Sequence, residues 1–215
     1  MRIDDLKKEN NERLSSDYLK DIASSITKVD KKYCQWEYQD GSSQKIERVF
    51  AYELYHQLRK LTNSNPKYKE LRIDGEISKE VYQEIETCGL LNLHSSKRRH
   101  FSPDMVIHYG QTNRKEESQI AIIEIKTREI SNSNLIDTIL KLNHYIRVLN
   151  FQYAIFISVN TEINKVSKQL RYFFDDPSGK EWHGRFNRII IMNYNQRKLE
   201  VDTLLGILKA EDKLF

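Results

Sequence analysis

The fold of this chain is decided by residues 102–126, where the stretch SPDMVIH (102–108) is followed, after a polar segment, by QIAIIEIK (119–126). Each stretch contains a run of apolar or β-branched residues, and the segment between them is rich in turn-forming residues. This pattern predicts two neighbouring strands joined by a surface loop. Side chains alternate between the two faces of a strand, so Glu124 and Lys126 share one face and Ile123 and Ile125 the other.

A carboxylate and an ammonium therefore project side by side from a strand that is otherwise apolar. A Glu-x-Lys pattern is common in a chain with 31% charged residues, and by itself it most often marks a solvent-exposed ion pair at a strand edge. Here the pattern ends an apolar strand, and Pro103-Asp104 stands at the start of the strand before it. Burying an isolated charge is costly, so this combination points to a function.

The combination resembles the PD-(D/E)xK nuclease superfamily. Asp104 matches the first acid of the family motif, Glu124 the second acid and Lys126 the lysine. The resemblance implies an α/β fold with a restriction-endonuclease-like core, of element order αβββαβ, in which helices flank a mixed central sheet. The hydrophobic patterns independently predict that order, with a helix from residue 44, strands at 71–77, 103–108 and 119–126, a helix from 132 and a strand at 151–159.

The remaining patterns extend this core at both ends. They predict a helix over about 16–27 and an aromatic strand at 33–38 before it, then a helix from 161, strands at 188–192 and 199–201, and a last helix from 202 or 203. We therefore divide the chain into an N-terminal helical and aromatic extension, residues 1–43, and a nuclease-like core domain with C-terminal strands and a helix, residues 44–215.

The resemblance also implies a catalytic metal site. A phosphodiester is anionic, so its hydrolysis needs positive charge, which Mg²⁺ (or Mn²⁺) supplies from a shell of oxygen ligands. Asp104 and Glu124 would hold the metal with the backbone carbonyl of Ile125, and Lys126 would orient or deprotonate the attacking water or stabilise phosphoryl charge. Glu53 matches the acid often found on the first core helix, and we expect it to complete the site, with Glu76 as the alternative.

Three further groups of residues are weaker candidates. A basic cluster, Lys97, Arg98 and Arg99, lies just before Pro103-Asp104 and is predicted to contact phosphates, although such runs are usually solvated loops. His108 comes four positions after Asp104 on the same strand face. Lys141 lies on the helix after the motif, where it either borders the site or faces solvent.

Composition is consistent with a cytoplasmic, DNA-cleaving enzyme without requiring it. The 215 residues carry a net charge of +4, show no signal-peptide pattern or membrane span, and contain only two cysteines, without metal-ligand spacing. We expect a divalent-metal-dependent DNA endonuclease of restriction or defence type, with nucleic acid as partner; a homodimer or a defence-system partner protein is left open. The alternative is a catalytically silent nuclease-like domain that binds nucleic acid or a protein.

Overall fold

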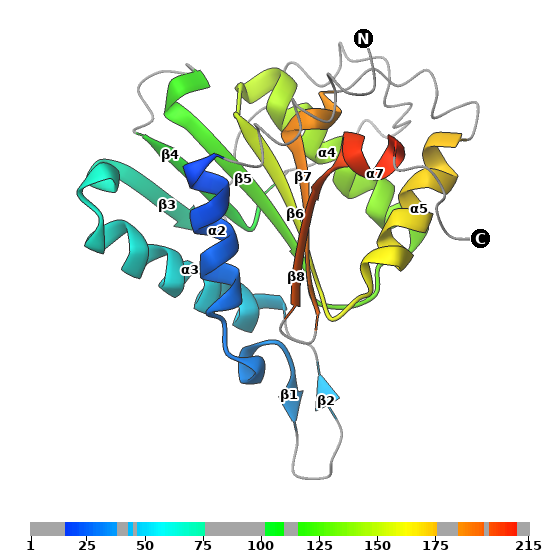
Figure 1. Cartoon of the computed structure of the whole chain (residues 1–215), viewed down its shortest axis with the longest axis horizontal. Coiled ribbons are helices and arrows are strands. Elements are labelled where there is room, and N and C mark those ends of the chain that lie inside the picture. The colour runs from blue at the N-terminus through cyan, green and yellow to red at the C-terminus, as the bar shows by residue number, and fades with distance from the viewer. Residues whose placement is uncertain are drawn as a thin grey trace.

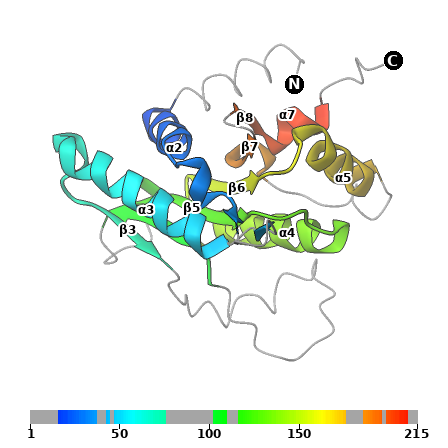
Figure 2. The ribbon, with the colours of Figure 1, turned by 90° about the horizontal axis from the view of Figure 1, so that it is seen from below.

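The computed structural model describes residues 16–37, 43–44, 47–75, 102–109, 116–175, 185–195 and 198–209. Its centre is a mixed six-stranded sheet with helices on both faces, as Figures 1 and 2 show. This confirms the predicted α/β class and the mixed sheet flanked by helices.

The strand order in the sheet follows the order in the sequence, β3-β4-β5-β6-β7-β8. β5, β6 and β7 are parallel to one another, whereas β4 is antiparallel to β3 and β5, and β8 is antiparallel to β7. The strands are β3 (Leu71–Gly75), β4 (Met105–Tyr109), β5 (Gln119–Lys126), β6 (Tyr153–Val159), β7 (Ile189–Asn195) and β8 (Lys198–Thr203).

Of the helices that the structure describes, two cover one face of the sheet and three cover the other (Figure 1). The helices are α2 (Asp17–Thr27), α3 (Glu47–Ser64), α4 (Asn132–Leu149), α5 (Ile163–Asp175) and α7 (Leu204–Lys209). α2 and α3 share one hydrophobic core with the sheet, and α4, α5 and α7 share the second. The short elements are β1 (Trp36–Glu37), β2 (Ser43–Gln44), and the 3₁₀ turns η1 (Lys31–Tyr33), η2 (Pro66–Tyr68), η4 (Glu116–Ser118) and η5 (Phe186–Arg188).

The described elements α3, β3, β4, β5, α4 and β6 follow one another in the predicted order. α2, from the segment assigned to the N-terminal extension, contributes Leu19 and Ile22 to the same core as α3. Among the helices that the structure describes, none is long and apolar enough to cross a membrane.

The alternation of side chains along β5 decides which helices meet the motif. Ile123 and Ile125 pack into the core shared with α2 and α3, while Ile122 packs into the core shared with α4. Because Glu124 has the same parity as Ile122, its side chain lies on the α4 side of the sheet. α3 packs on the opposite side through a stripe of buried residues, Phe50, Leu54 and Leu58.

Candidate functional site

Asp104 and the Glu-x-Lys pattern of β5 meet at one end of the sheet. The antiparallel register pairs Met105 with Ile123, so the residue before β4 lies beside the end of β5. Asp104 Oδ2 accepts a hydrogen bond from the backbone N–H of Ile125, with an N···O distance of 2.6 Å. Since Ile125 lies between Glu124 and Lys126, this bond brings Asp104 close to these two residues, from which it is distant in the sequence.

Glu124 is buried against α4, where it forms an ion pair. Its side chain is 6% exposed, and the Nζ of Lys141 lies 2.6 Å from its Oε1. Lys141 also donates a hydrogen bond to the backbone carbonyl of Ser102, at 3.3 Å. Burial raises the pKa of Glu124, and the negative charge of Asp104 adds to the rise. The positive charge of Lys141 lowers this pKa, and the net result is a pKa of about 7.

Lys126 forms a second ion pair, with the helix on the other side of the sheet. Its Nζ donates a hydrogen bond to Oε1 of Glu47, the first residue of α3, at 2.9 Å. Burial by itself would lower the pKa of Lys126, but the bond to Glu47 and the nearby carboxylates raise it above the usual value. Lys126 is therefore a charged ammonium at neutral pH, suited to stabilise negative charge rather than to accept a proton.

Burial also raises the pKa of Asp104, and the charge of Glu47 adds to this rise. The hydrogen bond from Ile125 and the charge of Lys126 oppose it. Three carboxylates and two ammonium groups thus influence one another at this end of the sheet.

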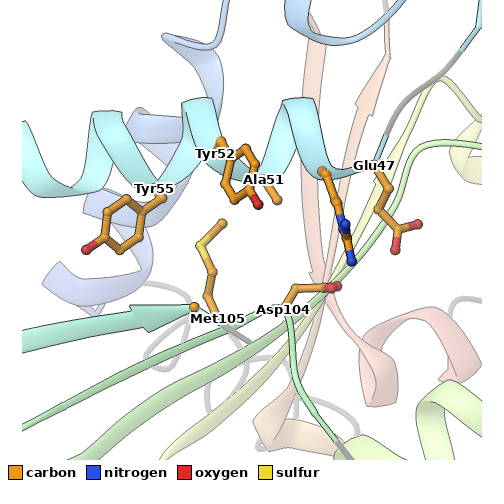
Figure 3. Close-up of a pocket in the computed structure, with 8 residues that line it drawn as sticks. Glu47, Ala51, Tyr52, Tyr55, Asp104 and Met105 are labelled. Carbon is orange, nitrogen blue, oxygen red and sulfur yellow. The ribbon is translucent and has the colours of Figure 1, made fainter. Parts of the chain in front are cut away.

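Two pockets open beside these residues, and the first turn of α3 separates them. Glu47 and Arg48 line both pockets. One, of about 780 Å³, is lined by the ion-paired residues Glu124, Lys126 and Lys141 together with the segment that leads into α4. The other, of about 470 Å³, has Asp104 at its edge, as Figure 3 shows.

Tyr145 lies behind the ion pair on α4. Its ring centroid is 5.9 Å from the Nζ of Lys141, and its side chain is fully buried. Within the described part of the chain, its hydroxyl has no hydrogen-bond partner. Burial raises the pKa of Tyr145, and the charges of Glu124 and Asp104 raise it further, so the phenol stays protonated beside the two acids.

Glu53 does not join this group. Its Oε1 accepts a hydrogen bond from Gln57 Nε2 at 2.5 Å, and it lines neither of the two pockets. α3 packs on the face of the sheet opposite to Glu124, and only its first two residues, Glu47 and Arg48, line the pocket that holds Glu124 and Lys126. The geometry therefore gives the predicted metal-ligand role of Glu53 no support, and Glu47 is the α3 acid nearest the motif.

His108 lies away from the site as well. The register places it near the other end of β4, where its buried imidazole Nε2 is 2.7 Å from Asp74 Oδ2. Four residues of strand span about 13 Å, which explains why a shared face does not bring His108 to Asp104. Glu76, Lys97, Arg98 and Arg99 lie outside the described residues.

Sequence reasoning flagged Lys141 but missed Glu47, Arg48 and Tyr52, all on α3. A charged or aromatic residue outside the apolar stripe of a helix looks like part of a solvated face. The position of Glu47 was the available signal. Glu47 is an acid in the first turn of α3, and that turn lies near the end of β5.

The acids fit a divalent cation in part. Asp104 and Glu124 offer carboxylate oxygens, the ligands that Mg²⁺ prefers. Burial is the main cause of their raised pKa values, and a neighbouring carboxylate adds to each rise, so a cation would favour the ionised form of both acids. Among the described residues, however, no group of three or more His, Cys, Asp or Glu side chains is placed to hold a metal ion.

No model of a known protein family, no curated protein and no solved structure matches this chain. A functional hypothesis therefore has to be argued from the site itself.

Proposed function

We propose that the chain is a divalent-metal-dependent nuclease with a restriction-endonuclease-like core, cleaving DNA as an endonuclease of restriction or defence type. The observation that carries the proposal is the hydrogen bond from Ile125 N–H to Asp104, which joins the acid before β4 to the Glu-x-Lys pattern at the end of β5. Asp104 lines one pocket, and Glu124 and Lys126 line the neighbouring one. Two acids and a charged lysine so close together suit metal-dependent phosphodiester hydrolysis.

Asp104 and Glu124 would hold the cation, Mg²⁺ or Mn²⁺. Water, phosphate oxygens and the backbone carbonyl of Ile125 would complete its coordination shell. The bound cation would supply positive charge that draws the phosphate in and stabilises the transition state. Lys126, kept protonated by Glu47 and the other acids, would add a second positive charge facing the phosphate.

Lys141 has a separate role in the proposal. The ammonium of Lys141 offsets the buried charge of Glu124, at 2.6 Å. With a cation held by Glu124, Lys141 would be available to contact the substrate phosphate. Lys141 is thus a positioning residue that keeps Glu124 ionisable before the metal arrives.

The catalytically silent alternative also has an observation in its favour. The ion pairs Lys141–Glu124 and Lys126–Glu47 join one of the two proposed metal ligands, Glu124, and the proposed catalytic lysine to other groups of the chain. Such a site is complete without a metal, as in a domain that only binds nucleic acid or a protein. The two functions differ in whether a divalent cation binds and whether phosphodiester bonds break.

The test is cleavage of plasmid, linear duplex, single-stranded DNA and RNA with Mg²⁺, Mn²⁺ or chelator. We expect cation-dependent cleavage by the wild type and its loss in Asp104→Ala, Glu124→Ala and Lys126→Ala, each of which stays folded. Asp17→Asn and Lys198→Gln, in exposed ion pairs of other elements, serve as charge controls and retain activity. Near wild-type turnover in one of the three variants excludes that residue, and in all three it excludes the nuclease.

A further inference from the structure

The pocket beside Asp104 has an aromatic lining that the proposed hydrolysis does not use. Tyr52, Tyr55 and Ala51 of α3 line the pocket together with Met105 at the start of β4, and Figure 3 shows the two tyrosines on the helix and Met105 below it. Tyr52 is 66% exposed, and it belongs to neither hydrophobic core of the described residues. The packing of the fold therefore does not explain why the exposed ring of Tyr52 lies in a pocket with the acids Glu47 and Asp104.

We infer that this pocket binds an unpaired nucleobase by stacking on Tyr52, so that the chain acts on single-stranded or unpaired nucleotides rather than on continuous duplex. The inference rests on the proposed function, because it names the substrate class of the same site.

The lining suits the flat face and the charged backbone of a nucleotide. Exposed aromatic rings stack on any base, because every base has a π-face. The side chains of Ala51 and Met105 offer an apolar floor, and Arg48 brings a guanidinium to the wall. The volume of about 470 Å³ lies within the range of small-ligand pockets, which accept a single base but no double helix.

The position of the pocket connects it to the site of hydrolysis. Asp104 stands at its edge, and Glu47 and Arg48 line it together with the larger pocket that holds Glu124 and Lys126. A phosphate held by Lys126 and by a cation at Asp104 would therefore leave a neighbouring nucleotide beside the pocket that Tyr52 lines. A base inside a continuous duplex is stacked and paired, so it would have to leave the helix to enter.

The inference is tested by affinity in the presence of chelator, where the proposed enzyme cannot cleave. Fluorescence anisotropy would compare labelled oligothymidylate, an abasic strand of the same length and a blunt hairpin duplex. We expect Tyr52→Ala to weaken binding of oligothymidylate about tenfold and to change affinity for the abasic strand and the duplex by less than about twofold. Tyr52→Phe keeps the ring and the affinity.

Tyr172→Ala is the matched control, because Tyr172 is 75% exposed on α5 and lines neither pocket. The inference is overturned if Tyr52→Ala binds oligothymidylate as the wild type does, or if it loses equal affinity for all three probes. A Tyr52-dependent preference for oligothymidylate without any cation-dependent cleavage would keep the base pocket and reject the nuclease. Cleavage that depends on Asp104 but not on Tyr52 would keep the nuclease and reject the base pocket.

Discussion

At the scale of single residues, the site is controlled by the cost of burying Glu124. A carboxylate that is 6% exposed stays ionised only if positive charge compensates it, and Lys141 at 2.6 Å provides that charge in the metal-free chain. The neighbouring Asp104 works against ionisation. The pKa of about 7 follows from this balance, and it places the switch between the neutral and the charged form in the physiological range.

Glu124→Gln should stabilise the metal-free fold at high pH. An acid whose pKa rises from 4.5 to about 7 on folding holds its proton longer in the folded state, so its contribution to stability is lost as pH rises through that window. The loss is on the order of 3 kcal/mol. Urea unfolding in chelator at pH 5 and at pH 8 measures this loss. The free energy of unfolding of the variant, relative to that of the wild type, should be higher at pH 8 than at pH 5. A difference that does not change with pH would show that Glu124 titrates normally.

Lys141→Met should change the pH dependence of metal binding rather than its strength alone. Without the ammonium, the pKa of Glu124 rises further, so cation affinity at pH 6.5 should fall below that of the wild type. At pH 9 Glu124 loses its proton more readily than at pH 6.5, and the variant, which lacks the competing ammonium, should bind Mn²⁺ more tightly than the wild type.

Isothermal titration with Mn²⁺ at both pH values measures this crossing. Lys198→Met, at an exposed lysine of β8, is the matched control and should leave both affinities unchanged. A loss of affinity of the same size at pH 6.5 and pH 9 would mean that Lys141 only positions Glu124 by contact.

Residue types and parity made Asp104, Glu124 and Lys126 predictable. A charged pair at the end of an apolar strand stands out in a sequence, and period-two alternation correctly places Glu124 opposite to Ile123 and Ile125. The partner Lys141 could only be named as a candidate, because the sequence does not give the rotation of a helix against a strand. Tyr52 gave no signal, since an exposed tyrosine is ordinary until a pocket is seen beside it.

At the scale of elements, the placement of α3 decides which acid belongs to the site. The stripe Phe50, Leu54 and Leu58 packs the helix on the face away from Glu124. Glu53 lies within that helix and meets Gln57, whereas Glu47 begins it and meets Lys126. The sequence identifies the stripe, but not how far along the strands the helix begins, and this is why Glu53 was expected where Glu47 is found.

Glu47→Gln should weaken metal binding, while Glu53→Gln should not. Both substitutions remove one negative charge from the same helix, so only position distinguishes them. Loss of Glu47 frees Lys126 and removes an acid at the edge of the site, and we expect metal affinity to fall about tenfold, the size typical of residues that support metal ligands. Mn²⁺ titration at pH 8 compares the two variants. A larger effect of Glu53→Gln would restore the role first expected from the sequence.

The order of elements was predictable because each has a clear period. The helices show apolar residues at a spacing of three to four, the strands show short apolar or alternating runs, and the described elements follow the expected sequence. The parallel pairing of β5 with β6 agrees with the strand–helix–strand connection between them. Residues 78–100 gave no firm prediction, because their sequence lacks a sustained hydrophobic period, and they lie outside the described residues.

At the scale of the whole molecule, charge is spread rather than concentrated. A net charge of +4 on 215 residues gives only weak general attraction to a polyanion. The described site itself balances its charges in pairs, Lys141 with Glu124 and Lys126 with Glu47. Strong binding to a phosphate backbone therefore requires a local cluster of positive charge elsewhere.

The cluster Lys97, Arg98 and Arg99 is the sequence-based candidate for these contacts, and it precedes Asp104 in the chain. Replacing all three with Gln should weaken binding to unrelated DNA sequences alike. It should also flatten the plot of log affinity against log salt by up to about 0.9 for each lost contact, because fewer counterions are released.

The matched control replaces the exposed Lys20, Lys168 and Lys198 of α2, α5 and β8 with Gln. Both triple variants lower the net charge by three, so a purely global attraction predicts equal changes in the salt slope. Contacts made by residues 97–99 predict a change in the first variant alone. Equal slopes in the two variants, measured by anisotropy on one DNA duplex across a salt series, would assign the cluster to a solvated segment without a phosphate contact.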